Sequence, residues 1–142
     1  MKSVLSALAL CALAACATIT PIPYDPNPAR VGDAATEARQ IILANVMQGC
    51  IAEIEIGPTM MTVKFVCSSG VGNYVMRFDK VDTITLSESG GWYRVLVSHK
   101  DGIAPFRWTS RSLDDMKRLA DALTALSSAK PAPAPAAAGT TT

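Results

Sequence analysis

The residues best suited to covalent chemistry are two cysteines in the middle of the chain, Cys50 and Cys67. Cys50 opens, and Cys67 closes, a pair of stretches in which apolar and polar residues alternate as in half-buried strands. A four-residue loop at 57–60 pairs apolar with apolar along this hairpin and sets the two cysteines directly opposite each other. In an oxidising compartment they are a candidate disulfide, and the alternative is two buried thiols that pack as small hydrophobes.

Two arginines, Arg94 and Arg107, are the second candidate pair. They fall opposite each other on an outward strand face if a hairpin loop at 99–102 sets the register. Like charges opposed across strands are unfavourable unless an anion or an acidic side chain lies between them. The pair therefore suggests a contact with an anion or a lipid headgroup. The alternative is neutralisation by Glu88 or Asp82.

Other polar residues fit ordinary surface positions. His99 is the only histidine and falls in the predicted hairpin loop, with nothing nearby to complete a catalytic triad. Glu53 and Glu55 share an outward strand face, with Lys64 across the hairpin, as solvated side chains would. Phosphate-binding, dinucleotide-binding, serine-hydrolase and zinc-protease motifs are all lacking, and the cysteines have no further metal ligands beside them. We therefore expect no catalytic residue, no metal site, no cofactor and no enzymatic activity.

The net charge of the chain indicates which class of partner is disfavoured. The chain has 13 Lys and Arg against 12 Asp and Glu, for a net charge of +1. Proteins that bind nucleic acid carry clustered excess positive charge. The sequence thus argues against a nucleic-acid partner.

The N-terminus reads as an export signal. Lys2 precedes an apolar run from Val4 to Ala15. A run of about a dozen residues is too short to cross a bilayer, which needs about 20, and it is typical of the hydrophobic part of a signal peptide.

The segment Leu13-Ala14-Ala15-Cys16 resembles the lipobox of bacterial lipoproteins. The resemblance implies a diacylglycerol thioether on Cys16, cleavage after Ala15 and acylation of the new amine, for instance with palmitate. Cys11 is a poorer acceptor because a leucine precedes it. The absence of an aspartate after Cys16 favours the outer membrane over the inner, with the protein facing the periplasm. The alternative is an ordinary signal peptide, with Cys16 incidental.

Composition divides the chain into four parts. Residues 1–15 form the signal peptide, and residues 16–32 hold the lipid-bearing cysteine and a proline-rich tether. Fully extended, such a tether would hold the domain up to about 45 Å from the bilayer. Residues 33–128 form a small α+β domain. Residues 129–142 are a Pro/Ala-rich tail expected to be disordered.

Within the domain, the pattern predicts a helix, about six antiparallel strands and a second helix. Asp33 caps the first helix, which extends to about Gln48, and Ser112 caps the second, an amphipathic helix that extends to about Ser127. The predicted strands are 50–56, 61–67, 73–78, 81–86, 92–98 and 104–108, the last at a sheet edge because of its proline. Such an order indicates a meander or a partly open barrel covered by a helix.

The stretch from Arg77 to Leu126 resembles the second half of a pleckstrin-homology-like barrel, in which a final helix plugs the open end of the strands. The fold it implies hosts many functions, so function must come from the site. We expect a lipid-anchored envelope protein that binds a protein partner or serves as an assembly module. A domain that binds a small ligand or an anionic headgroup is the alternative, and an enzyme without a recognisable motif is the least favoured one.

Overall fold

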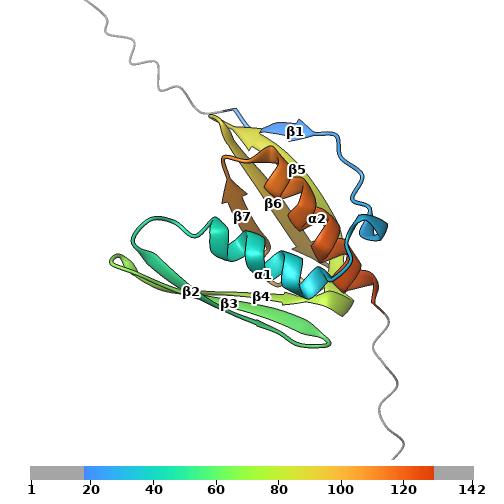
Figure 1. Cartoon of the computed structure of the whole chain (residues 1–142), viewed down its shortest axis with the longest axis horizontal. Helices are drawn as coiled ribbons and strands as arrows, with labels where there is room; N and C mark the ends of the chain where they lie inside the picture. Colours follow the sequence, from blue (N-terminus) through green and yellow to red (C-terminus); the bar gives the residue numbers. More distant parts are fainter. Residues whose placement is uncertain (1–17, 130–142) are drawn as a thin grey trace, which may run out of the picture.

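The computed structural model describes residues 18–129, so the predicted signal peptide, Cys16 and the predicted tail from residue 130 lie outside the described residues. The strands are β1 (Thr20–Ile22), β2 (Cys50–Ile56), β3 (Met60–Cys67), β4 (Gly70–Arg77), β5 (Val81–Ser89), β6 (Trp92–His99) and β7 (Phe106–Ser110). The helices are α1 (Ala34–Ala44) and α2 (Leu113–Ser128), with 3-10 turns η1 (Pro28–Arg30) and η2 (Phe78–Lys80). Figure 1 shows their arrangement.

The α+β class and the order helix, strands, helix are confirmed. The prediction of one meander or partly open barrel is wrong. The described strands form two antiparallel sheets, β1-β5-β6-β7 and β2-β3-β4, which do not close into a barrel. The change of sheet occurs at η2, where Phe78 is buried and its N–H donates to the carbonyl of Thr59. This turn leads the chain away from β4, so β5 pairs elsewhere.

The register of the β2–β3 hairpin is confirmed residue by residue. Cys50 lies opposite Cys67, and Ile54 lies opposite Val63. Ile54 and Val63 are buried, whereas Glu53 and Lys64 face outward as a cross-strand pair. A slip of one residue would turn every side chain to the opposite face of the sheet. The alternating pattern therefore excludes such a slip.

Both helices begin where their capping residues predict. The backbone N–H of Thr36 donates to Asp33 and holds the pKa of that carboxyl below its ordinary value. Ser112 accepts from the N–H of Asp115. The first helix ends at Ala44, earlier than predicted, because the Asn45 side chain turns back to donate to the Ile41 carbonyl.

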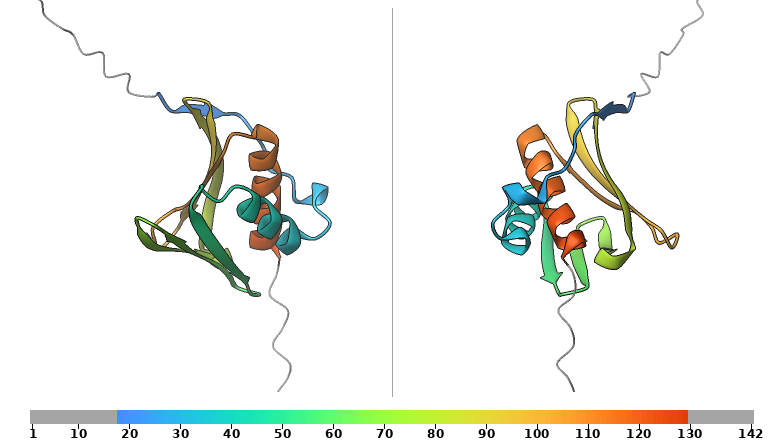
Figure 2. Two further views of the ribbon diagram at one scale, coloured as in Figure 1. Left: turned by 60° about the vertical axis from the view of Figure 1, so that its left-hand side comes forward. Right: turned by 90° about the vertical axis from the view of Figure 1, so that its right-hand side faces the viewer.

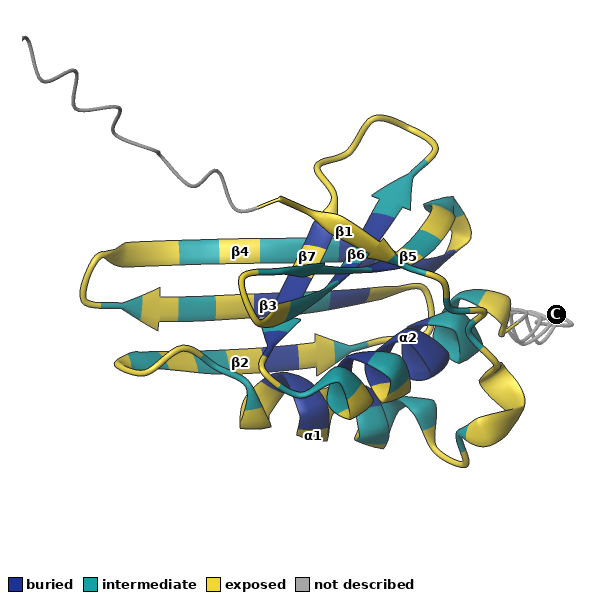
Figure 3. Cartoon of the chain, turned by 90° about the horizontal axis from the view of Figure 1, so that it is seen from above, coloured by how far each residue is buried: buried dark blue, intermediate teal, exposed yellow. Residues whose placement is uncertain are grey.

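The two helices lie side by side in the angle between the sheets (Figure 2). The buried residues gather where the helices meet the strands (Figure 3). The fully buried side chains of this core are mainly aliphatic, with one aromatic ring: Phe106, Ile42, Met61, Met76, Met116, Leu119, Leu123, Val63, Val95 and Val97. Apolar surface from both sheets and both helices thus forms one core, the main favourable contribution to stability.

The predicted tether requires a correction from residue 18 onward. Strand β1 pairs with β5, with Thr20 opposite Glu88 and Ile22 opposite Leu86. The 3-10 turn η1 then packs on α2. The prolines do not prevent this, because β1 is an edge strand and η1 has proline at its first position, where a missing N–H does no harm.

One buried carboxylate fixes this segment to the domain. Asp121 of α2 is 3% exposed and accepts hydrogen bonds from the Tyr24 hydroxyl at 2.9 Å and the Asn27 N–H at 2.6 Å. Arg30 lies 3.8 Å from the same carboxylate. A buried charge is tolerated only when paired and hydrogen-bonded, so the segment and Asp121 depend on each other. We call this group the Asp121 latch.

The stretch Gly70-Val71-Gly72, expected to be a loop, belongs to β4. Gly72 lies opposite Phe65 of β3, and the phenylalanine ring occupies the space above it. A Cβ on Gly72 would lie 1.9 Å from Cζ of Phe65. The glycine is therefore required by close packing rather than by a turn.

Substituting Gly72 by alanine should destabilise the fold by about 1–3 kcal/mol, because the Phe65 ring must leave its place. Denaturant unfolding measures the loss. Gly32→Ala is the matched control, since no atom lies within 4 Å of its new Cβ. Replacing Phe65 by leucine in the Gly72→Ala variant should restore part of the loss, and equal stability of the two alanine variants would contradict the packing.

Alkaline titration tests the latch. Burial, then the hydrogen bond to Asp121, raises the pKa of Tyr24 above its ordinary value of about 10. The protonated phenol therefore contributes stability in full below about pH 10, and this contribution is lost as pH rises through the raised pKa. Tyrosinate absorbance should show a late component that Tyr24→Phe removes and Asp121→Asn shifts to lower pH. Titration of Tyr24 at or below the ordinary value would count against the latch.

Candidate functional site

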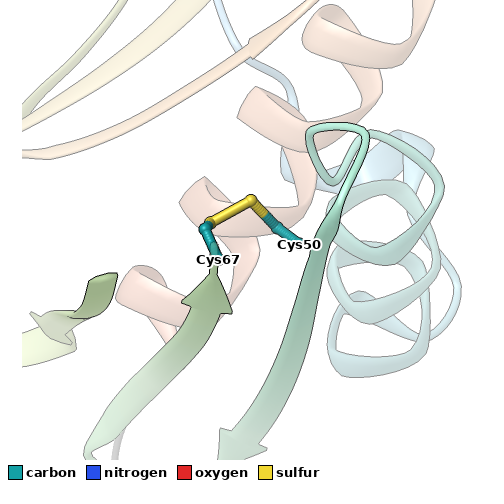
Figure 4. Close-up of a disulfide and its surroundings, with 2 residues drawn as sticks. All are labelled: Cys50 and Cys67. Atoms are coloured by element: carbon teal, nitrogen blue, oxygen red, sulfur yellow. A yellow bond between two sulfur atoms is a disulfide. The ribbon is translucent and has the colours of Figure 1, made fainter. Parts of the chain in front are cut away.

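The structure joins Cys50 and Cys67 in a disulfide, with a sulfur–sulfur distance of 2.01 Å (Figure 4). The bridge links neighbouring strands at the end of the three-stranded sheet where β2 begins and β3 ends. It closes a loop with a sequence separation of 17 residues. A cross-link that closes a loop of this length stabilises the folded state mainly because it restricts the unfolded chain. The bridge therefore stabilises the fold at one end of this small sheet.

The two predicted arginines are not directly opposite each other. Arg94 lies opposite Thr109, and Arg107 lies opposite Leu96. The loop between β6 and β7 is longer than predicted, since β7 begins only at Phe106, after the proline. The register is therefore shifted by two residues, which keeps both arginines on the outward face but separates them along the strands.

Of the two acidic neighbours suggested for these arginines, Glu88 binds elsewhere, because it accepts from the N–H of Gly91 within the β5–β6 turn. Between residues 18 and 129, no carboxylate forms an ion pair with Arg94, Arg107 or Arg111. These guanidinium groups are thus available to an external anion.

A small apolar cleft lies beside the disulfide. Its volume is about 180 Å³, and it is lined by the disulfide, by rings from both sheets and by the residues after α1. Phe65 and Tyr74 come from the three-stranded sheet, and Trp108 comes from β7 of the other sheet. Exposed Arg107 and Met47 also line it. The cleft therefore brings the cysteine pair and one predicted arginine to the same place.

Aromatic contacts hold the two sheets together behind the cleft. The Tyr74 ring lies 5.4 Å from Phe65, 5.8 Å from Phe106 and 6.5 Å from Trp108, centroid to centroid. These spacings are typical of stabilising aromatic pairs. The indole N–H of Trp108 is buried and has no acceptor in the part of the chain that the structure describes. Such an unsatisfied donor costs about 1–3 kcal/mol.

Exposed apolar side chains lie on both faces of the three-stranded sheet at its disulfide end. Ile51, Val66 and Val71 form a row across the outer face of β2, β3 and β4, opposite the face that carries the disulfide and the cleft. They are 74%, 54% and 78% exposed, and Met47 at the cleft is 70% exposed. We call Met47, Ile51, Val66 and Val71 the apolar end. Grouped exposed hydrophobic side chains commonly mark an interaction surface.

Sequence reasoning missed most of this site. The strand pattern placed the cysteines and put Glu53 outward, but Ile51 on that same face was given no role. The signal was present, because an isoleucine, a valine and a second valine occupy outward positions on three successive strands. This row can be recognised only when β4 begins at Gly70, because Val71 then pairs with Val66.

A second, polar hollow of about 520 Å³ lies between the N-terminal segment and the helices. Its charged residues bind one another: Arg118 pairs with Glu37 and Asp115, and Arg30 with Asp121. These contacts fasten segments of the fold to each other. The hollow does not indicate a catalytic group.

His99 differs from its predicted place in a solvated loop. It is the last residue of β6 and lies on the inward side with Val95 and Val97, half-buried. Both ring nitrogens are buried without a hydrogen-bond partner among residues 18–129. No nucleophile of a triad lies against it in that part of the chain.

Comparison with known protein-family models, characterised proteins and solved structures finds no match to this chain. In the described range 18–129, neither helix is long and apolar enough to span a membrane. The same range holds no cluster of three His, Cys, Asp or Glu side chains that could bind a metal ion.

Reduction should destabilise the domain at this site. Breaking the Cys50–Cys67 bridge should lower the free energy of unfolding by about 3 kcal/mol, as expected for a loop of this length. Guanidinium unfolding with and without reductant measures the change. The Cys50→Ala/Cys67→Ala variant should unfold like the reduced protein, and reductant should not change its free energy of unfolding. If reductant changed nothing in the native protein, the bridge would have no stabilising role.

Proposed function

We propose that this protein is a lipid-anchored bacterial envelope lipoprotein whose domain is a non-catalytic binding module for a protein partner. The lipid anchor rests on Leu13-Ala14-Ala15-Cys16 and the apolar run before it. The binding role rests on one observation, the apolar end beside a cleft of about 180 Å³. Pockets for small-molecule ligands usually measure about 300–1,000 Å³. A cleft of this size fits one inserted side chain better than a whole ligand.

The chemistry of the cleft narrows the partner. Its lining is mainly apolar, with ring faces from Phe65, Tyr74 and Trp108. An aliphatic or aromatic anchor from another protein would fill it. A partner that wraps around this end of the sheet would also cover the row Ile51, Val66 and Val71 on the opposite face. This is the usual anatomy of a protein interface, in which a few buried anchors dominate the energy. Arg107 at the cleft could meet an acidic group beside the anchor.

Site-specific photo-cross-linking in native membranes tests the proposed binding surface. A cross-linking residue at Val71 should give one defined adduct, and adding Val66→Asp should abolish it because a charge would be buried in the interface. The same cross-linker at Thr85, exposed on β5, is the control and should give none. Equal adducts at both positions, or adducts that survive Val66→Asp, would contradict the binding surface.

The anchor has its own readout in the same preparation. The intact mass should equal residues 16–142 plus diacylglycerol and acyl groups. Cys16→Ala should lose the lipid, whereas Cys11→Ala, the matched control, should keep it. A lipid-free mass or retention of residues 1–15 would contradict the lipid anchor. The binding surface would still be tested independently by the cross-linking result.

A further inference from the structure

The distance between the lipid-bearing cysteine and the folded domain is short. Strand β1 begins at Thr20 and is fixed by its pairing with β5. Four residue steps separate Cys16 from Thr20, and an extended chain spans at most about 3.6 Å per step, or about 14 Å in all. Each headgroup layer is about 5–8 Å thick. A lipid on Cys16 therefore holds Thr20 within about 10 Å of the membrane surface.

The elements beside Thr20 must then face the bilayer. Thr20 lies opposite Glu88, and the β5–β6 turn follows, with Ser89 opposite Trp92. Figures 1 and 2 both show the segment that leads into β1 beside this turn, while α2 ends at the far side of the molecule. The end of the domain around β1 and the β5–β6 turn is therefore the membrane-proximal end.

The side chains at this end suit a lipid surface. Trp92 is 45% exposed, and the Arg111 guanidinium lies 4.7 Å from the centre of its ring. Ile19 is 57% exposed just before β1. Tryptophan is favoured at membrane–water interfaces, and an arginine stacked on it can still bind phosphate.

Charge complementarity points the same way. Arg94 lies two residues from Trp92 on the same face of β6, and Arg111 lies two residues beyond its partner Thr109. Neither arginine is paired with a carboxylate within residues 18–129. Phosphate oxygens of lipid headgroups are acceptors of the kind these donors lack.

We propose that the domain docks on the anchoring bilayer through Ile19, Trp92, Arg94 and Arg111. The proposal rests on the lipid anchor of the proposed function. In this orientation α2 leads away from the membrane, so the end of this helix lies on the side away from the bilayer. The predicted anion contact is thereby reassigned, with Arg111 in place of Arg107 as the neighbour of Arg94.

Fluorescence quenching by brominated lipids tests this docking. The full lipidated protein is placed in vesicles of phosphatidylethanolamine with a minority of phosphatidylglycerol. The chain has two tryptophans, and Trp108 is only 9% exposed, so the quenched emission should come from Trp92 and be lost in Trp92→Phe. Arg111→Glu should lose much of the quenching, whereas Arg77→Glu, at an arginine paired with Asp79, should not.

The outcomes separate the docking from the anchor. Vesicle flotation and intact mass first establish that the protein carries lipid. A lipidated, floating protein without quenching, or with quenching that persists in Trp92→Phe, would overturn the docking and leave the anchor intact. Equal quenching in the two arginine variants would overturn the role of Arg111. A protein without lipid would overturn the anchor and the docking together.

Discussion

The arrangement of this molecule depends on the buried carboxylate of Asp121. An ionised carboxylate that is 3% exposed must have its lone pairs satisfied, and its donors come from Tyr24 and Asn27, far away in the sequence. The segment that carries these donors also supplies β1. Holding Tyr24 on α2 therefore keeps the preceding strand paired with β5 and makes the N-terminal segment part of the domain.

The pairing of β1 with β5 limits how far the domain can lie from a membrane to which it is anchored. A free proline-rich tether would let the domain move tens of ångströms from the bilayer. With β1 held in the sheet, only residues 17–19 separate the proposed anchor from the fold. The proposed docking through Trp92 and Arg111 follows from this short reach. The proposed protein interface lies mainly on the other sheet, with Arg107 and Trp108 of β7 contributing to its cleft, so the two roles would use largely different surfaces.

The sequence predicts those features that local pattern determines. The alternation around Cys50 and Cys67 and the short loop at 57–60 together set the register of that hairpin. Asp33 and Ser112 mark both helix starts through their capping side chains. The β6–β7 register was missed by two residues, because a two-residue slip keeps every side chain on its face and leaves the pattern unchanged. Arg94 and Arg107 were consequently paired in error.

Other features depend on contacts across the fold. Three residues of β1 are too few to show periodicity, and their proline favours a loop interpretation. The prediction of an amphipathic second helix gives Asp121 no role, although the small residues Ala120 and Ala122 beside it suggest a helix covered on two sides. The cleft itself needs both sheets, and the point where the chain leaves the first sheet, η2, carries no strong sequence signal.

Hydrogen exchange of the β1 amides tests the central claim most directly. In the native protein, amides of Thr20 and Ile22 should be protected, and Asp121→Ala should abolish this protection while the central strand β6 remains protected. That result would show that the latch holds the N-terminal segment in the sheet. Unprotected β1 amides in the native protein, or protection unchanged by Asp121→Ala, would contradict the account.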